Sequence, residues 1–131
     1  MKLAIVTTFA ALFAFGLFVR FTRAEDAPKS SPIVGVLIDQ MCGEKQMKKD
    51  DPQAAAEKHP KACAMKEGCA ESGYAVISGK KMYKFDDNGN KLAKDYLAKS
   101  DSKTKVSVEG TVKDDGTMAV TAINPAPEKE G

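Results

Sequence analysis

The order of the apolar segments is the strongest constraint on what this chain can fold into. Five short segments have the pattern of β-strands, at residues 33–39, 74–77, 82–85, 105–112 and 118–122. A helical pattern at 91–99 separates the third segment from the fourth, with Leu92 and Tyr96 on one face. This is the element order of an OB-fold, a small Greek-key barrel. We expect a five-stranded OB-like barrel, because the alternative, an open α+β meander, would leave long sheet edges unpaired.

Turn residues separate these segments. Residues 78–81 contain Gly79 and predict a hairpin between the second and third strands, and Asp114-Asp115-Gly116 predicts another between the last two. Residues 86–90 (Asp-Asp-Asn-Gly-Asn) predict a turn. Gly35 lies inside the first strand and indicates a bulge or a close backbone approach.

The first 24 residues have the pattern of a secretory signal peptide. Lys2 precedes an apolar run at 3–19, and Thr22-Arg23-Ala24 offers small residues for cleavage before Glu25. We expect an exported protein, periplasmic or extracellular, with no membrane attachment after cleavage. An uncleaved N-terminal anchor is the alternative, because the run is near the lower length limit for crossing about 30 Å of hydrocarbon.

Without residues 1–24, the balance of charged and aromatic residues in the chain is different. The 131-residue chain has 20 basic and 18 acidic residues, but three of the basic ones and five of the six Phe lie in residues 1–24. The remainder has 17 basic and 18 acidic residues, no arginine and four aromatic residues. These features argue against nucleic acid as a partner, because they offer no bidentate phosphate contacts and few stacking surfaces.

The rest of the chain divides into a linker at 25–32, a domain at 33–124 and a flexible tail at 125–131. The domain contains an insert at 40–73, too long for a structureless loop. Asp51-Pro52 predicts the start of one short helix and 60–66 a second, joined at His59.

The insert holds all three cysteines and the only histidine of the chain: Cys42, His59, Cys63 and Cys69. A disulfide is expected, because an exported domain with a thin core gains from one. Closing Cys42 to Cys69 is worth about 3.5 kcal/mol and Cys63 to Cys69 about 2.4 kcal/mol, so Cys42 is the expected partner of one of the other two. Which of them pairs with it stays open, and one cysteine is left over.

A metal site is the alternative use of these residues. If a helix begins at His59, Cys63 lies on the same face four residues later, and Cys42 and Cys69 would complete a Cys3His set for Zn. Thioethers from Met41, Met47 and Met65 would instead suit Cu(I). Without such a site, no cofactor is expected.

Thiol catalysis is a further alternative, with Cys63 as a nucleophile and His59 as its base. No orienting acid or second redox cysteine accompanies this pair in the sequence, so we do not expect an enzyme. Asp39 is explained as the end of a strand, and Asp86 and Asp87 as turn residues.

Several short motifs together resemble an uncharacterised family of small exported bacterial domains with an OB-like barrel and a Cys/His-containing insert after the first strand. The motifs are Gly35-Val36-Leu37-Ile38-Asp39, Met41-Cys42-Gly43, His59, Cys63, Cys69, Gly73-Tyr74, Met82-Tyr83-Lys84-Phe85 and Val106-Ser107-Val108-Glu109-Gly110-Thr111-Val112. The resemblance implies the fold and the export, and no activity.

Two functions follow as expectations. The insert after the first strand would lie at the mouth of the barrel, where OB-folds place ligand-binding loops. This favours a non-enzymatic binding module, or one that interacts with the cell envelope, with an unknown ligand or partner and a stabilising disulfide. The alternative is a periplasmic Zn- or Cu-binding protein that uses His59 and the cysteines.

Overall fold

A computed structural model describes residues 31–128 of the protein. The expected signal peptide, most of the expected linker and the last three residues of the expected tail lie outside the described residues. Between residues 31 and 128, no helix combines the length and the apolar character needed to cross a membrane.

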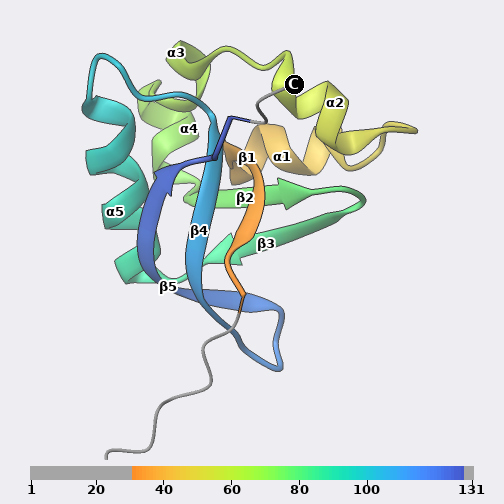
Figure 1. The fold of residues 1–131 in the computed structure, drawn as a ribbon. Helices are drawn as coiled ribbons and strands as arrows, with labels where there is room; N and C mark the ends of the chain where they lie inside the picture. The colour runs from red at the N-terminus through yellow and green to blue at the C-terminus, as the bar shows by residue number, and fades with distance from the viewer. Residues whose placement is uncertain (1–30, 129–131) are drawn as a thin grey trace, which may run out of the picture.

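Five strands form a closed barrel in the order β1-β2-β3-β5-β4, as Figure 1 shows. The strands are β1 (Ile33–Asp39), β2 (Tyr74–Ser78), β3 (Lys81–Phe85), β4 (Lys105–Val112) and β5 (Thr117–Pro125). Neighbouring strands are antiparallel except β3 and β5, which close the barrel through a short parallel pairing of Lys84 with Thr117 and Phe85 with Met118. The expected five-stranded OB-like barrel is confirmed.

Strand β1 is central because it pairs with β4 through its first half and with β2 through its second half. At Gly35 the strands approach so closely that a Cβ atom would lie 2.3 Å from the carbonyl oxygen of Ile77. Of the two roles expected for Gly35, the close approach is the one observed. The irregularity of the barrel lies instead in β4, between Glu109 and Gly110.

Side chains pack on both faces of β1. One face contributes Leu37 to the barrel interior, together with residues such as Val76, Phe85 and Met118. The other face forms a smaller cluster of four buried residues beneath the insert: Val36, Ile38, Ala56 and Ile77. Burial on both faces explains why the first strand is an unbroken apolar run rather than an alternating one.

Helix α5 (Asp87–Ala98) begins inside the segment expected to be a turn, so the prediction of a turn at 86–90 is wrong. The Asp86 side chain caps the helix by accepting a 2.8 Å hydrogen bond from the backbone amide of Gly89. Asp and Asn are favoured at helix N-termini as well as in turns, which is why the two patterns look alike. Gly89 allows close packing, because a Cβ there would lie 2.7 Å from the Val120 side chain.

The insert forms four short helices rather than the expected two. They are α1 (Gln40–Gln46), α2 (Pro52–Glu57), α3 (Lys61–Ala64) and α4 (Glu67–Glu71), and they gather at one end of the barrel (Figure 1). Asp51 caps α2 as expected, by accepting from the Ala54 amide at 3.0 Å. The helix expected at 60–66 ends at Ala64, since Lys66 is extended and precedes α4.

The ordered barrel continues slightly beyond the expected domain end at residue 124. Pro125 still belongs to β5 and lies opposite Val106. The amide of Ala126 donates to the carbonyl of Lys105 at 3.1 Å. The first two residues of the expected tail therefore pair with β4.

Candidate metal centre

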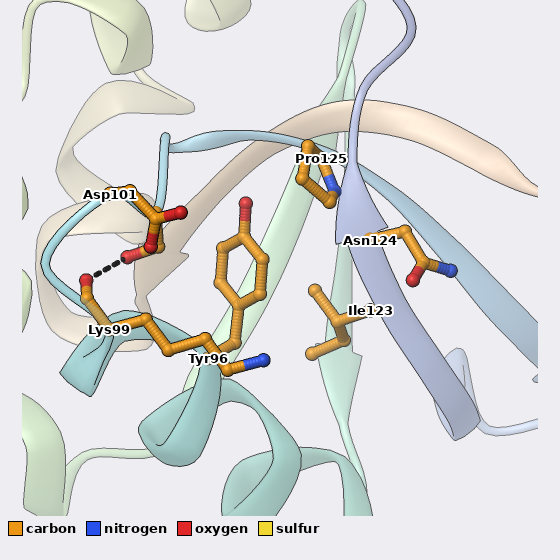
Figure 2. Close-up of a pocket in the computed structure, with 7 residues that line it drawn as sticks. Tyr96, Lys99, Asp101, Ile123, Asn124 and Pro125 are labelled. Carbon is orange, nitrogen blue, oxygen red and sulfur yellow. Dashed lines mark hydrogen bonds between the residues drawn. The ribbon is translucent and has the colours of Figure 1, made fainter.

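Two hollows lie in the surface of the described residues. One, of about 180 Å³, lies between the end of α5 and β5, and Tyr96 and Ile123 line it (Figure 2). The Tyr96 hydroxyl in it already donates to the carbonyl of Lys103 at 2.9 Å. The other, of about 810 Å³, lies beside Val34, Gly35 and Lys105. Neither hollow is lined by any cysteine or by His59.

The chemically unusual group is Asp39, at the point where β1 passes into α1. Its side chain is fully buried. One carboxylate oxygen, Oδ1, caps α1 by accepting from the Cys42 amide at 2.9 Å. The other, Oδ2, is buried and has no hydrogen-bond partner. A buried carboxylate oxygen without a donor is costly, so this atom needs a ligand or a function to account for it.

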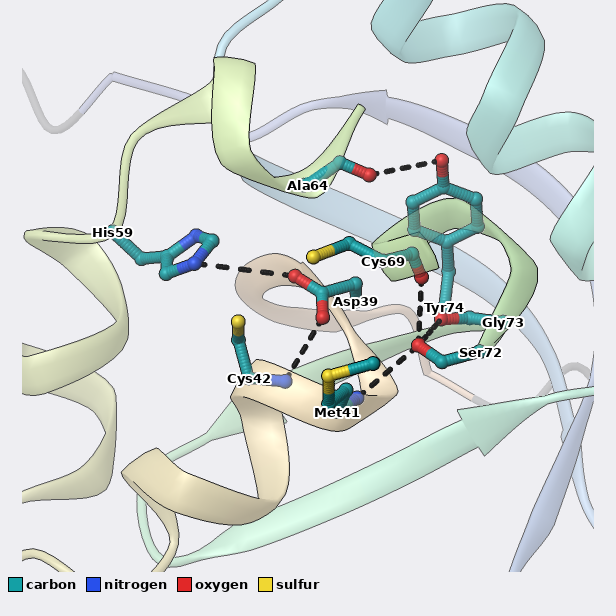
Figure 3. A network of polar contacts seen from close by, with 9 residues as sticks. All are labelled: Asp39, Met41, Cys42, His59, Ala64, Cys69, Ser72, Gly73 and Tyr74. Atoms are coloured by element: carbon teal, nitrogen blue, oxygen red, sulfur yellow. Dashed lines mark hydrogen bonds and ion pairs between the residues drawn. The ribbon is translucent and has the colours of Figure 1, made fainter. Parts of the chain in front are cut away.

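His59 is the nearest basic group to this orphaned oxygen. Its Nε2 lies 3.9 Å from Asp39 Oδ2, which is too long for a hydrogen bond (Figure 3). The His59 side chain is only 12% exposed, and it comes from the short link between α2 and α3. The contact is an ion pair rather than a hydrogen bond, so Oδ2 still lacks a hydrogen-bond donor.

Cys42 completes a compact group of three. Single donor atoms of Asp39, Cys42 and His59 all lie within 4.8 Å of one another. In tetrahedral zinc sites, ligand atoms are about 3.3 to 3.8 Å apart, which follows from metal–ligand distances of about 2.0 to 2.3 Å. A contraction of about 1 Å would therefore bring these three atoms to the spacing of zinc ligands.

The surroundings of Cys42 favour its protonated form when no metal is bound. Burial, followed by the charge of Asp39 and then the neighbouring Cys69, raises the pKa of the Cys42 thiol to about 11. A thiol that is protonated at neutral pH is a weak nucleophile. Cys42 is therefore not an activated catalytic thiol, and a metal ion bound to it would have to displace its proton.

Cys69 also lies next to Asp39, and its sulfur is directed toward the carboxylate (Figure 3). It is close enough to Cys42 to affect that thiol directly. It also contributes, after burial and Asp39, to raising the pKa of Tyr74. Cys69 therefore lies beside the group of three without being part of it.

The Ser72 hydroxyl links α1 and α4, the helices that carry Cys42 and Cys69. Ser72 Oγ donates to the carbonyl of Cys69 at 2.6 Å and accepts from the amide of Met41 at 3.2 Å. Met41 precedes Cys42 in α1, so this bridge joins the backbone of Cys69 in α4 to the residue next to Cys42 (Figure 3).

The structure keeps part of the predicted ligand set and changes the rest. Of the predicted residues Cys42, His59, Cys63 and Cys69, the compact group contains Cys42 and His59 but neither Cys63 nor Cys69. The predicted spacing of His59 and Cys63 assumed a helix starting at His59. That helix starts at Lys61, because Pro60 is extended with ψ 137°, so the two residues do not share a helix face.

Asp39 is the residue that sequence reasoning missed, since a strand-end explanation was available for it. The sequence feature that could have identified it is its spacing to Cys42. An acid three residues before a helical position is typical of a helix N-cap.

The expected disulfide is not present in the structure. Cys42, Cys63 and Cys69 all carry free thiols and are partly buried. Of the two partners considered for Cys42, Cys69 is the one placed beside it. Among the methionines considered for Cu(I), Met47 packs against the smaller core cluster, whereas Met41 and Met65 are each 44% exposed.

Comparisons with models of protein families, with curated proteins and with solved structures found no match to this chain.

Proposed function

We propose that this domain binds one metal ion with the ligand preferences of Zn²⁺ through Asp39, Cys42, His59 and Cys69. The observation that supports this most strongly is the orphaned oxygen of Asp39, buried and surrounded by an imidazole and a thiol. A cation at this point would give that oxygen a partner. Of the two functions expected from the sequence, the geometry favours metal binding over a disulfide-stabilised binding module.

The mixture of donors indicates which metal to test first. Carboxylate oxygen, imidazole nitrogen and thiolate sulfur together suit Zn²⁺, which accepts all three, whereas Cu(I) prefers sulfur. The thioethers nearest in sequence, Met41 and Met65, are exposed rather than directed into a shared group. Zinc is therefore the proposed ion, and copper is the competitor that the experiment must include.

Four protein donors leave no open coordination position, which is typical of structural or carrier zinc sites rather than catalytic ones. A non-enzymatic role follows from this as part of the proposal. The signal pattern at residues 1–24 supports a place outside the cytoplasm, where such a domain would hold or pass on metal.

Equilibrium dialysis of the reduced protein against Zn²⁺, with Cu(I) in parallel, tests the proposal. We expect one zinc per chain in the wild type. Cys42→Ser and His59→Gln should each lower zinc affinity by at least about tenfold. At other metal sites, even the loss of a residue that only hydrogen-bonds to a ligand costs that much affinity.

Cys63→Ser is the matched control, because it removes a thiol from the same insert without touching the group of three. It should bind zinc as the wild type does. A wild type that retains no zinc, or a Cys63→Ser variant that loses as much affinity as Cys42→Ser, would contradict the assigned ligand set. A clear preference for Cu(I) would reject zinc as the ion.

A further inference from the structure

Two of the four proposed ligands are thiols whose sulfurs both lie beside the Asp39 carboxylate, at the junction of α1 and α4 (Figure 3). The Ser72 hydroxyl fixes the two backbones at this junction, through its bonds to the Cys69 carbonyl and the Met41 amide. Neither thiol is fully buried, so a small reagent can reach them. The same arrangement that places two sulfurs on one metal ion also places them for bonding to each other.

We propose that Cys42 and Cys69 are a redox pair whose disulfide and whose metal complex exclude each other. This rests on the proposed metal-binding function and adds a means of regulating it. The oxidised form would lack both thiolate ligands and keep only Asp39 and His59. Because thiolates are the strongest zinc ligands of the set, the disulfide form should release the metal.

The oxidant is a small-molecule disulfide, and the exchange balances in two steps. One cysteine first loses its proton, and its thiolate attacks a sulfur of the external disulfide, forming a mixed disulfide and releasing one small thiolate. The second cysteine then attacks the protein sulfur of the mixed disulfide and releases the second small thiolate. The two released thiolates take up the two protons lost by the cysteines, so two protein thiols are oxidised while one disulfide is reduced to two thiols.

Bound metal would oppose this reaction. A thiolate whose lone pair is held by zinc is a poorer nucleophile toward a disulfide than the free thiolate. The disulfide would therefore form when metal is scarce and external disulfides are abundant. The two thiols would stay reduced when metal is bound. Cys63 lies in α3 rather than at the junction of α1 and α4, so it is not assigned to the pair.

Oxidised glutathione, added to the metal-free and the zinc-loaded protein, tests the inference. Intact mass and peptide mapping should show a Cys42–Cys69 disulfide in the metal-free protein, formed at least about tenfold more slowly when zinc is bound. The oxidised protein should bind zinc at least about tenfold more weakly, and reduction should restore binding. Cys63→Ser should behave as the wild type, and Cys69→Ser should form no internal disulfide.

The possible results distinguish failure of the redox pair from failure of the proposed metal-binding function. If the reduced wild type binds no zinc, the proposed metal-binding function is wrong, and so is its regulation by the redox pair. If zinc binds but glutathione stays attached to one cysteine, or links Cys63 instead, the redox pair alone is overturned. Zinc that stays bound after the Cys42–Cys69 disulfide has formed also overturns it.

Discussion

Asp39 has two separable roles, one for each carboxylate oxygen. Oδ1 caps α1 and so fixes the helix that carries Cys42, whereas Oδ2 has no protein donor and faces His59. A residue needed only as a cap does not require its second oxygen to be buried. This division makes Asp39 the best position for separating folding from metal binding.

Asp39→Asn should lower zinc affinity by at least about tenfold while leaving the metal-free protein folded. Asparagine is as good an N-cap as aspartate, so the free energy of unfolding without metal should change by less than about 1 kcal/mol. Asp39→Ala removes the cap as well and should cost about 0.5–2 kcal/mol. Urea unfolding and zinc dialysis of both variants measure these effects; an Asn variant that binds zinc normally would remove Asp39 from the ligand set.

Individual residues show where sequence reasoning about the site succeeds and where it fails. The clustering of cysteine and histidine identifies the insert, and Cys42 and His59 do lie together. Cys63 was included because a spacing of four suits a helix, but extended Pro60 breaks that helix at its start. Asp39 was left out because burial of a strand end depends on helices folding over it, which a local pattern cannot show.

At the scale of elements, β1 connects the barrel to the insert. It pairs with β4 and β2, packs on both faces and ends at Asp39. Its path depends on the close approach at Gly35, where β1 meets the Ile77 carbonyl of β2. Displacement of β1 would disturb both the barrel wall and Asp39, the proposed metal ligand at the end of this strand.

Gly35→Ala should therefore destabilise the fold by about 1–3 kcal/mol, the usual cost of forcing an extra carbon into a packed interior. Gly68→Ala is the matched control, because a Cβ at Gly68 meets nothing within 4 Å and the residue lies in α4. Alanine favours helix there and should raise stability by up to about 1 kcal/mol. Urea denaturation compares the two; equal stability of Gly35→Ala and the wild type would refute the close approach.

Helix boundaries were the least predictable part of the elements. The strands lie within a few residues of their predicted positions, because alternating or continuous apolar runs mark them directly. Helix α5 was placed four residues too late, since its first turn consists of Asp, Asn and Gly residues that are equally typical of turns. Helices α1 and α4 carry little apolar pattern, and packing on the barrel end determines them instead.

At the scale of the whole molecule, the order of strands and helix was sufficient to predict the OB-like barrel. The number of aromatic residues was equally informative, because so few lie in residues 25–131 that each one matters to the core. Tyr74 and Tyr96 are buried, and each hydroxyl donates to a backbone carbonyl, of Ala64 and Lys103 respectively.

These two tyrosines should make the protein sensitive to alkali. Burial raises the pKa of both above the usual value of about 10. The folded state then holds more protons than the unfolded state above about pH 10, so stability is full below that pH and falls as pH rises. Urea unfolding at about pH 9 and about pH 11 should show the loss, and Tyr96→Phe should lose less. An equal loss in Tyr96→Phe would assign the effect to other groups.

The central claim, a zinc centre built from Asp39, Cys42, His59 and Cys69, is tested most directly by X-ray absorption spectroscopy of the reduced, zinc-loaded protein. The account predicts a four-coordinate ion with two sulfur ligands at about 2.3 Å and two nitrogen or oxygen ligands at about 2.0 Å. A first shell made only of nitrogen and oxygen, or one with three sulfurs that include Cys63, would contradict it.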